Sequence, residues 1–384
     1  MFIERRIVSA IKKQKDKFPV LAVTGPRQSG KTTLLRKIFA GYRYVTLENP
    51  DIRQYAESDP VGFLNQYEKY VIFDEVQRVP GLFSYIQSRV DESGIMGQYI
   101  LSGSQNFQLL KSITQSLAGR VAMFKLMPLD FKELHSKKLL ADDYMNAAIK
   151  GTYPAIFDRD IAPSVFYANY MQTYVERDVA ELLNVRDTRL FRQFLGLCAG
   201  RAGQLLNIST LANDAGIAFN TAKSWLSILE SSYLIFFLLP YFQNHNKRLV
   251  KTPKLYFYDT GLLCHLLKIK STKQFQTDRL KGNLFENMIV AEFQKTNYHL
   301  HKHQEFYFWQ DSNGNEIDLL WFEEQECVAT EIKATQTITG TLFKQLDKFE
   351  SGSEIKMPVQ KVLVYGGNTS QRRTHYKVKS WREI

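Results

Sequence analysis

The sequence predicts an α/β protein with a parallel-sheet domain at its start, a central helical region and a second, smaller α/β domain at its end. Three stretches support this prediction. Residues 18–38 have the pattern of a buried strand, a glycine-containing loop and a helix. Residues 205–259 indicate two helices around a glycine turn and then two strands, and residues 281–336 indicate a helix, a hairpin and a third strand. A chain of 384 residues exceeds one hydrophobic core, so several domains are expected.

The first of these stretches centres on GPRQSGKT, which follows the apolar run PVLAVT. That run is typical of a strand buried on both faces, and glycine and proline end it. The helix that begins at Lys31 then places Leu34, Leu35 and Ile38 on one face. Strand, glycine loop and helix in this order are the context of a P-loop, so a bound nucleotide is expected.

The residue types in this loop fit phosphate chemistry. Gly25 and Gly30 let the backbone bend so that successive N–H groups point at phosphate oxygens. Lys31 would reach the β- and γ-phosphates, and the Thr32 hydroxyl would ligate Mg²⁺. The residues expected to contact the nucleotide are Gly25, Pro26, Arg27, Gln28, Ser29, Gly30, Lys31, Thr32 and Thr33.

A second apolar strand, YVIF, ends in the acidic pair Asp74 and Glu75. Acids cap many strand ends, but after a P-loop this pair indicates a hydrolysing site. Asp74 would hold Mg²⁺, and Glu75 would polarise the attacking water.

The central region contains a short helix, a turn at Gly216 and a longer helix that starts at Asn220 or Thr221. Two strands around a basic tip would complete a winged helix-turn-helix. On double-stranded DNA, the major-groove residues would be Asn220, Lys223 and Ser224, and the tip residues at the phosphates would be Lys247, Arg248, Lys251 and Lys254. The alternative is a lid or a protein contact, with the tip solvated.

The C-terminal region carries acids in a pattern suited to metal-assisted phosphodiester cleavage. Asp318 lies in EIDLL, and strand alternation puts Glu331 and Lys333 on one face of the next strand. Asp318 and Glu331 would bind Mg²⁺, and Lys333 would orient or deprotonate water. Glu286, on the preceding helix, would complete the metal site. This arrangement is similar to the restriction-endonuclease-like fold, which also serves as an inactive scaffold.

Several motifs together resemble the prokaryotic AAA-type ATPases that carry an uncharacterised C-terminal region. They are GPRQSGKTTLL, IFDEVQRVP, LSGSQ, LAGR…PLDFKEL, GTYPAIF, YMQTYVERDV, YFYDTGLL, GNLFENMIVAEF and EIDLL…EIKA. The resemblance covers nearly the whole chain and implies ATP with Mg²⁺ as cofactors. We expect an AAA-type ATPase domain at 1–135, a helical linker or lid at 136–200, a winged helix-turn-helix at 201–266 and a restriction-endonuclease-like domain at 280–384.

The resemblance also implies two further catalytic residues. Ser104, at the end of QYILSGSQ, would sense the γ-phosphate from a strand between the P-loop strand and the acidic strand; a plain strand-to-turn boundary is the alternative. Arg120 would act as an arginine finger, either in its own chain or toward a neighbouring subunit of a homo-oligomer. A structural arginine paired with a carboxylate is its alternative.

Composition indicates the cellular compartment and the charge of a partner, but it does not identify that partner. Lys and Arg number 50 against 39 Asp and Glu, a net charge of +11 that favours an anionic partner. Three scattered cysteines predict neither a disulfide framework nor a zinc site, so a reducing cytoplasm is expected. The apolar run YLIFFLLPYF is too short to cross a bilayer, so no membrane partner is expected.

Two classes of function remain open from the sequence. In the first, ATP turnover serves an action on DNA through the winged helix and the nuclease-like domain. In the second, the chain is a nucleotide-dependent switch or scaffold for a protein partner, and the nuclease-like domain is inactive.

Overall fold

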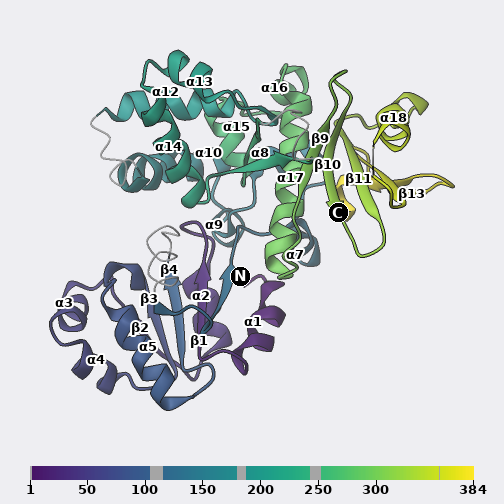
Figure 1. The fold of residues 1–384 in the computed structure, drawn as a ribbon. Helices are drawn as coiled ribbons and strands as arrows, with labels where there is room; N and C mark the ends of the chain where they lie inside the picture. Colours follow the sequence, from purple (N-terminus) through teal and green to yellow (C-terminus); the bar gives the residue numbers. More distant parts are fainter. Residues whose placement is uncertain (1, 104–115, 180–186, 243–251, 354) are drawn as a thin grey trace. The chain divides into compact units, whose positions relative to one another are not determined.

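The computed structural model describes residues 2–103, 116–179, 187–242, 252–353 and 355–384. The chain forms two compact units (Figure 1). The first contains Met1–Leu129, Ser231–Tyr233 and Asn297–Lys302, and the second contains Asp130–Glu230, Leu234–Thr296 and His303–Ile384.

A five-stranded sheet forms the centre of the first unit. Its strands are β1 (Val20–Thr24), β2 (Arg43–Thr46), β3 (Val71–Asp74), β4 (Tyr99–Gly103) and β5 (Val121–Lys125). They lie in the order β2-β3-β4-β1-β5, and every neighbouring pair is parallel. The carboxyl ends of all five strands therefore meet at one edge. The strand expected between the P-loop strand and the acidic strand is present as β4.

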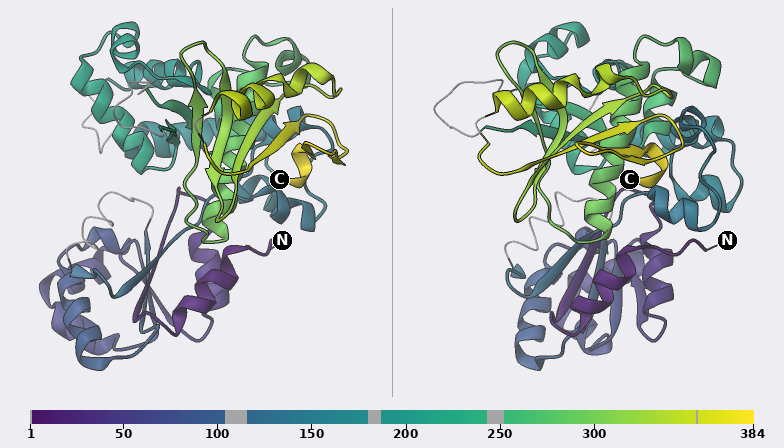
Figure 2. Two further views of the ribbon diagram at one scale, coloured as in Figure 1. Left: turned by 45° about the vertical axis from the view of Figure 1, so that its right-hand side comes forward. Right: turned by 90° about the vertical axis from the view of Figure 1, so that its right-hand side faces the viewer.

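Helices cover both faces of this sheet (Figures 1 and 2). On one face, α1 (Ile7–Lys15) and α2 (Lys31–Ile38) pack against alternate residues of β1, including Leu21 and Val23. On the other, α3 (Pro50–Ser58), α4 (Pro60–Gln66) and α5 (Leu82–Ser93) pack against Val20 and Ala22. Because both faces of β1 are covered, all five of its residues are buried. This explains its unbroken apolar sequence.

The second unit contains one sheet of nine strands. These are β6 (Gln204–Leu205), β7 (Ile235–Pro240), β8 (Lys254–Phe257), β9 (Tyr307–Gln310), β10 (Glu316–Phe322), β11 (Cys327–Lys333), β12 (Val359–Tyr365), β13 (Gln371–Arg372) and β14 (Lys377–Ser380). Their order is β13-β14-β12-β11-β10-β9-β7-β8-β6. The parallel pair β7 and β9 joins the central hairpin to the C-terminal strands. The expected boundaries near residues 201 and 280 therefore lie within one compact unit, and they remain predictions about the organisation of the sequence.

The helices of this unit surround the sheet. They are α7 (Phe131–Ser136), α8 (Tyr144–Lys150), α9 (Pro154–Asp158), α10 (Pro163–Tyr170), η2 (Met171–Val179), α12 (Thr188–Ala199), α13 (Ile208–Ala215), α14 (Phe219–Ser231), α15 (Thr260–Leu266), α16 (Thr272–Thr277), α17 (Lys281–His299) and α18 (Lys344–Gly352). α18 packs on β10, β11 and β12, where its Leu346 and Phe349 are buried.

The predicted helix–turn–helix elements are present as α13 and α14. α13 ends at Gly216, whose φ of 66° is the left-handed conformation that favours glycine. α14 begins at Phe219, one residue before the expected start. Its Trp225 packs edge-on against Phe191 and Phe194 of α12, and the antiparallel hairpin β7–β8 follows.

Candidate functional sites

The P-loop connects the carboxyl end of β1 to the first turn of α2. Gly25 has a φ of 147°, and a Cβ atom there would lie 2.1 Å from the carbonyl oxygen of Leu126. Gly30, with a φ of 93°, precedes the first residue of α2. Both positions require glycine, and the loop delivers its backbone to the N-terminus of a helix, where N–H groups favour anions.

Lys31 is the central cation of this loop. Its Nζ donates 2.9 Å hydrogen bonds to the carbonyl oxygens of Gly25 and Pro26. The side chain is only 7% exposed, and burial lowers the pKa of its ammonium group to about 8. These two carbonyl oxygens therefore hold the lysine against the loop. On nucleotide binding, the ammonium group would donate to phosphate oxygens in their place.

Asp74, at the end of β3, accepts hydrogen bonds from three elements. Its Oδ2 atom accepts from the Thr32 hydroxyl and from the Tyr44 hydroxyl, both at 2.7 Å. Its Oδ1 atom accepts from the Ser102 hydroxyl of β4 at 2.6 Å. The structure therefore brings together Thr32 and Asp74, the two residues predicted to hold Mg²⁺. A hydroxyl and a carboxylate side by side are donors that suit this ion.

Two of these partners were not among the predicted site residues. Tyr44 lies on β2 in a stretch without a motif, and burial raises its pKa. Ser102 lies in QYILSGSQ, but the sequence analysis assigned the sensing role to Ser104, which is outside the described residues. The parallel order of β3 and β4 places Ser102 directly beside Asp74.

Glu75, the predicted base, follows Asp74 in a left-handed turn with a φ of 55°. Its Oε2 atom accepts a 2.5 Å hydrogen bond from the side-chain amide of Gln77. That turn places Glu75 at the same sheet edge as the P-loop, and Gln77 orients it. Gln77 lies in the IFDEVQ motif, but sequence reasoning gave it no role.

Arg120 lies at the opposite edge of the sheet. It immediately precedes β5, and its carbonyl oxygen accepts from the backbone of Val20 at the amino end of β1. Its guanidinium group makes two hydrogen bonds, at 2.5 and 2.8 Å, with the carboxylate of Asp91 on α5. The structure thus places Arg120 away from the P-loop of its own chain and pairs it with a carboxylate, the structural alternative, and its catalytic role stays a prediction.

A buried arginine near the N-terminus donates hydrogen bonds to the backbone of the P-loop. Arg5 is 6% exposed and donates to the carbonyl oxygens of Ser29, at 2.8 Å, and Met127, at 2.6 Å. It thus connects the loop to the chain that follows β5. The sequence alone did not single out this residue, because its partners are far away along the chain.

The predicted C-terminal residues also meet in one place. In the antiparallel register of β10 and β11, Leu319 faces Thr330, so Asp318 and Glu331 form the next opposing pair. Lys333 Nζ lies 2.5 Å from Glu331 and 3.6 Å from Asp318. Asp318 Oδ2 also accepts from the backbone N–H of Ile332 at 2.7 Å. The predicted alternation of Glu331 and Lys333 on one face is confirmed.

Glu286, on α17, joins this group through β8. Its Oε1 atom accepts from Lys254 Nζ at 3.0 Å and from the Tyr256 hydroxyl at 2.6 Å. Lys254 also pairs with Glu316 at 2.5 Å and is only 3% exposed. The prediction that Lys254 belongs to a basic hairpin tip is therefore wrong, because the lysine is buried in the acidic site. The other three tip residues, Lys247, Arg248 and Lys251, lie outside the described residues.

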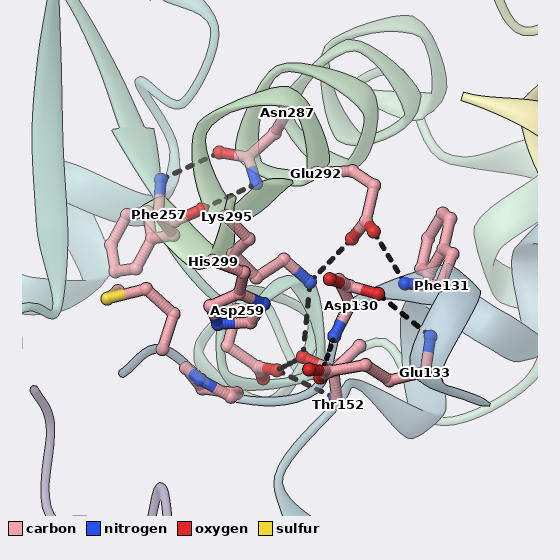
Figure 3. Close-up of polar contacts among 12 residues, drawn as sticks. Asp130, Phe131, Glu133, Thr152, Phe257, Asp259, Asn287, Glu292, Lys295 and His299 are labelled. Atoms are coloured by element: carbon pink, nitrogen blue, oxygen red, sulfur yellow. Dashed lines mark hydrogen bonds and ion pairs between the residues drawn. The ribbon is translucent and has the colours of Figure 1, made fainter. Parts of the chain in front are cut away.

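A backbone clamp sets the position of Glu286. The side-chain amide of Asn287 accepts from the N–H of Phe257 at 2.8 Å and donates to its carbonyl oxygen at 3.0 Å (Figure 3). Because Asn287 follows Glu286 and Phe257 follows Tyr256, this clamp fixes the contact between α17 and β8. Farther along α17, buried Glu292 pairs with Lys295 at 2.7 Å and accepts from the N–H of Phe131 at 2.5 Å. Asn287, Glu292 and Lys295 are polar residues in the otherwise apolar run NMIVAEFQK, and this pattern is the sequence signal that could have indicated these contacts.

Two carboxyl groups of the acidic site, those of Glu331 and Glu286, have raised pKa values. Burial, and next the charge of Asp318, raise the pKa of Glu331 to about 8. Burial, opposed in part by Lys254, raises the pKa of Glu286 to about 7. The second oxygen of Glu331, Oε2, is buried and has no hydrogen-bond partner among the described residues. A bound cation would satisfy this oxygen, so Asp318 and Glu331 fit a divalent ion.

Comparison with known proteins agrees with the fold of the first unit. Residues 17–135 match the model of the AAA domain family. Two domains of unknown function match the rest, DUF8612 at residues 141–273 and DUF4143 at residues 281–384. Residues 17–135, which contain the parallel sheet and the P-loop, therefore match an AAA domain.

Two mycobacterial proteins resemble the chain over most of its length. They are the uncharacterized proteins Rv2008c of Mycobacterium tuberculosis and Mb2031c of Mycobacterium bovis. Each is 30% identical over 342 residues, which are 88% of this chain and 75% of the relative. The chain belongs to the same protein family as these two. The chain is also similar to the Walker-type ATPase PABY2304 of Pyrococcus abyssi, which is 14% identical over 69% of this chain and 96% of its own, with a TM-score of 0.46.

No helix among the described residues combines the length and the apolar character that a membrane-spanning helix requires.

Proposed function

We propose that the protein binds ATP with Mg²⁺ at its P-loop and hydrolyses it. One observation carries the proposal: Asp74 is hydrogen-bonded to Thr32 of the P-loop helix and to Ser102 of the intervening strand. Three elements separated in sequence thus present a hydroxyl, a carboxylate and a further hydroxyl at the edge where the P-loop lies. This arrangement suits a nucleotide phosphate with its cation.

Each residue of this edge has a defined task in the proposal. The backbone N–H groups of the loop and the Lys31 ammonium bind the phosphates, and Thr32 and Asp74 hold Mg²⁺, which neutralises the developing charge. Glu75, oriented by Gln77, accepts a proton from the attacking water. Arg120 of a neighbouring subunit, in a homo-oligomer, would add a further positive charge.

The rate of ATP hydrolysis by the full chain, measured with Mg²⁺, tests this proposal. Lys31→Ala should abolish turnover, and Lys37→Ala, an exposed lysine of the same helix, should leave it unchanged. Equal rates in wild type and Lys31→Ala would remove the assignment. Both variants should keep the wild-type circular dichroism spectrum.

As a second function we propose metal-dependent cleavage of a phosphodiester by the restriction-endonuclease-like C-terminal site. The observation that favours it is the meeting of Asp318, Glu331 and Lys333, together with the buried, unpartnered Oε2 atom of Glu331 among the described residues. Asp318 and Glu331 would hold Mg²⁺, which as a Lewis acid stabilises charge on the phosphate. Lys333 would orient the attacking water.

Cleavage of plasmid DNA in Mg²⁺ tests this second function. Lys333→Ala should remove cleavage and leave ATP hydrolysis unchanged. Lys361→Ala is the matched control, because Lys361 also pairs with two carboxylates, Asp347 and Glu350, away from the site. Cleavage that persists in Lys333→Ala would exclude this lysine as the catalytic group.

For the partner we propose double-stranded DNA, bound by a winged helix made of α13, α14 and the β7–β8 hairpin. Asn220, Lys223 and Ser224 are all exposed on α14, as this proposal requires. A cleft of about 1180 Å³ between α10, α12 and α15 is lined by the basic side chains of Arg189, Arg192, Lys268 and Lys270. In this proposal, these side chains contact further DNA phosphates. Neutralised phosphates make the binding constant fall with salt.

The competing proposal is a nucleotide-dependent switch or scaffold for a protein partner. The rate of ATP hydrolysis with and without double-stranded DNA, at two salt concentrations, separates the two. Stimulation that weakens with salt supports DNA. Turnover that is indifferent to DNA, with no salt-dependent binding, supports a protein partner and a silent nuclease-like site.

A further inference from the structure

Three carboxylates of the second unit form a cluster beside the proposed cleavage residues. Glu286 of α17 and Glu316 and Asp318 of β10 each place an oxygen so that all three atoms lie within 4.8 Å of one another. Oxygen donors at this separation are the ligands that a divalent cation prefers. By donor chemistry alone, this cluster would be a second cation site.

The cluster already contains a cation from the chain itself. Lys254, the first residue of β8, places its ammonium nitrogen 3.0 Å from Glu286 and 2.5 Å from Glu316. The lysine is 3% exposed, and the ring of Phe308 lies 5.5 Å from the nitrogen. A buried ammonium is costly without partners of opposite charge, and these carboxylates supply them.

We propose that Lys254 is the resident cation of this cluster and excludes a divalent ion from Glu286 and Glu316. The inference rests on the second proposed function and limits it: the site takes one divalent ion, at Asp318 and Glu331, rather than two. In two-metal sites the ions are about 3.5–4 Å apart. The ammonium group contacts Glu286 and Glu316, where it repels a second ion and occupies two of the ligands that the ion would need. Lys333 also pairs with Asp318 and Glu331, but its side chain is 39% exposed against 3% for Lys254, so it can move into solvent when an ion binds there.

Titration of the full chain with Mn²⁺, without nucleotide, tests this by electron paramagnetic resonance of the free ion. Wild type should bind one ion that Asp318→Asn removes. Lys254→Met, which keeps the length of the side chain without its charge, should bind one additional ion. Addition of Glu316→Gln to Lys254→Met should remove that ion again. Lys361→Met, which removes the partner of Asp347 and Glu350 outside the cluster, should bind as wild type does.

The outcomes separate the inference from the function on which it rests. A folded Lys254→Met that gains no ion overturns the inference, even if wild type keeps its Asp318-dependent ion. A Glu316-dependent gain in Lys254→Met supports the inference, even if wild type binds no ion and the cleavage proposal fails.

Thermal melting decides the case in which Lys254→Met does not fold. Mn²⁺ should shift the melting temperatures of wild type and Glu316→Gln by the same amount. A shift of zero in both proteins also agrees with the inference. A stabilisation of wild type by Mn²⁺ that Glu316→Gln loses would place a metal on Glu316 and overturn the inference.

Discussion

The hydroxyl of Thr32 donates a 2.7 Å hydrogen bond to Oδ2 of Asp74, across 42 positions of sequence. The bond joins the first turn of α2, which follows β1, to the end of β3, a different strand of the sheet. Because β4 lies between β1 and β3, Ser102 of β4 reaches the other oxygen of the same carboxylate. The order of the strands therefore brings together the residues that are proposed to hold Mg²⁺.

Asp74→Asn should weaken the hydrogen bonds that join α2, β2 and β4 to the end of β3. The amide offers one acceptor oxygen in place of two, so at least one of the three hydroxyl donors loses its partner. We expect a loss of about 1–3 kcal/mol in the free energy of unfolding and a loss of Mg²⁺-dependent hydrolysis. Urea denaturation and steady-state kinetics measure the two effects. Asp51→Asn, an exposed acid of the same unit, should keep Mg²⁺-dependent turnover; if Asp74→Asn also keeps it, Asp74 does not hold the metal.

The affinity for ATP should depend on the protonation of Lys31. Burial lowers its pKa to about 8 in the free protein, and bound phosphates would raise it again. The complex then holds more protons than the free protein above pH 8, so the affinity falls as pH rises from there, by at most about tenfold per pH unit. A fluorescent ATP analogue titrated between pH 7 and 10 measures this. Lys31→Arg, which keeps its charge, should lack the dependence; the same fall in Lys31→Arg would assign it to another group.

Gly25→Ala should destabilise the first unit. Its Cβ would lie 2.1 Å from the carbonyl oxygen of Leu126, and the φ of 147° strains any side chain. We expect a cost of about 1–3 kcal/mol in the free energy of unfolding. Gly41→Ala is the control, because nothing lies within 4 Å of a Cβ there. Equal denaturation midpoints for the two variants would contradict the described loop conformation.

Arg120→Ala should leave the ATP affinity of a single chain unchanged. The arginine lies at the amino edge of the sheet, paired with Asp91, and the P-loop lies at the carboxyl edge. Isothermal titration at low protein concentration checks this expectation. A weakened affinity would place Arg120 at the nucleotide of its own chain. A loss of turnover that appears only at high protein concentration would instead identify a role toward a neighbouring subunit.

Sequence patterns predicted those site residues whose positions depend only on neighbours close by in the sequence. The glycines and Lys31 of the P-loop, the acid at the end of β3 and the alternation of Glu331 and Lys333 all follow from loop, strand-end and strand periodicities. Such features depend on residues close together in sequence. They required no knowledge of which strands become neighbours.

The contacts that depend on strand order or on helix packing were missed. Tyr44 and Ser102 reach Asp74 only because β2 and β4 lie on either side of β3. The sequence pattern placed Lys254 in a basic hairpin tip that meets phosphates or is solvated, yet its strand pairs within a sheet that brings it to Glu286 and Glu316. The clamp between Asn287 and Phe257 likewise requires a helix and a strand to meet at one register, which no local pattern specifies.

The central claim, that ATP is hydrolysed at the P-loop edge with Glu75 as the base, is tested most directly by Glu75→Gln. The measurement is the amount of ATP and ADP retained on the purified chain after incubation with radiolabelled ATP and Mg²⁺. We predict that Glu75→Gln retains ATP unhydrolysed, with turnover reduced by about 10²-fold or more, and that Glu92→Gln, an exposed acid of α5, behaves as wild type does. Turnover in Glu75→Gln at the wild-type rate would contradict the account.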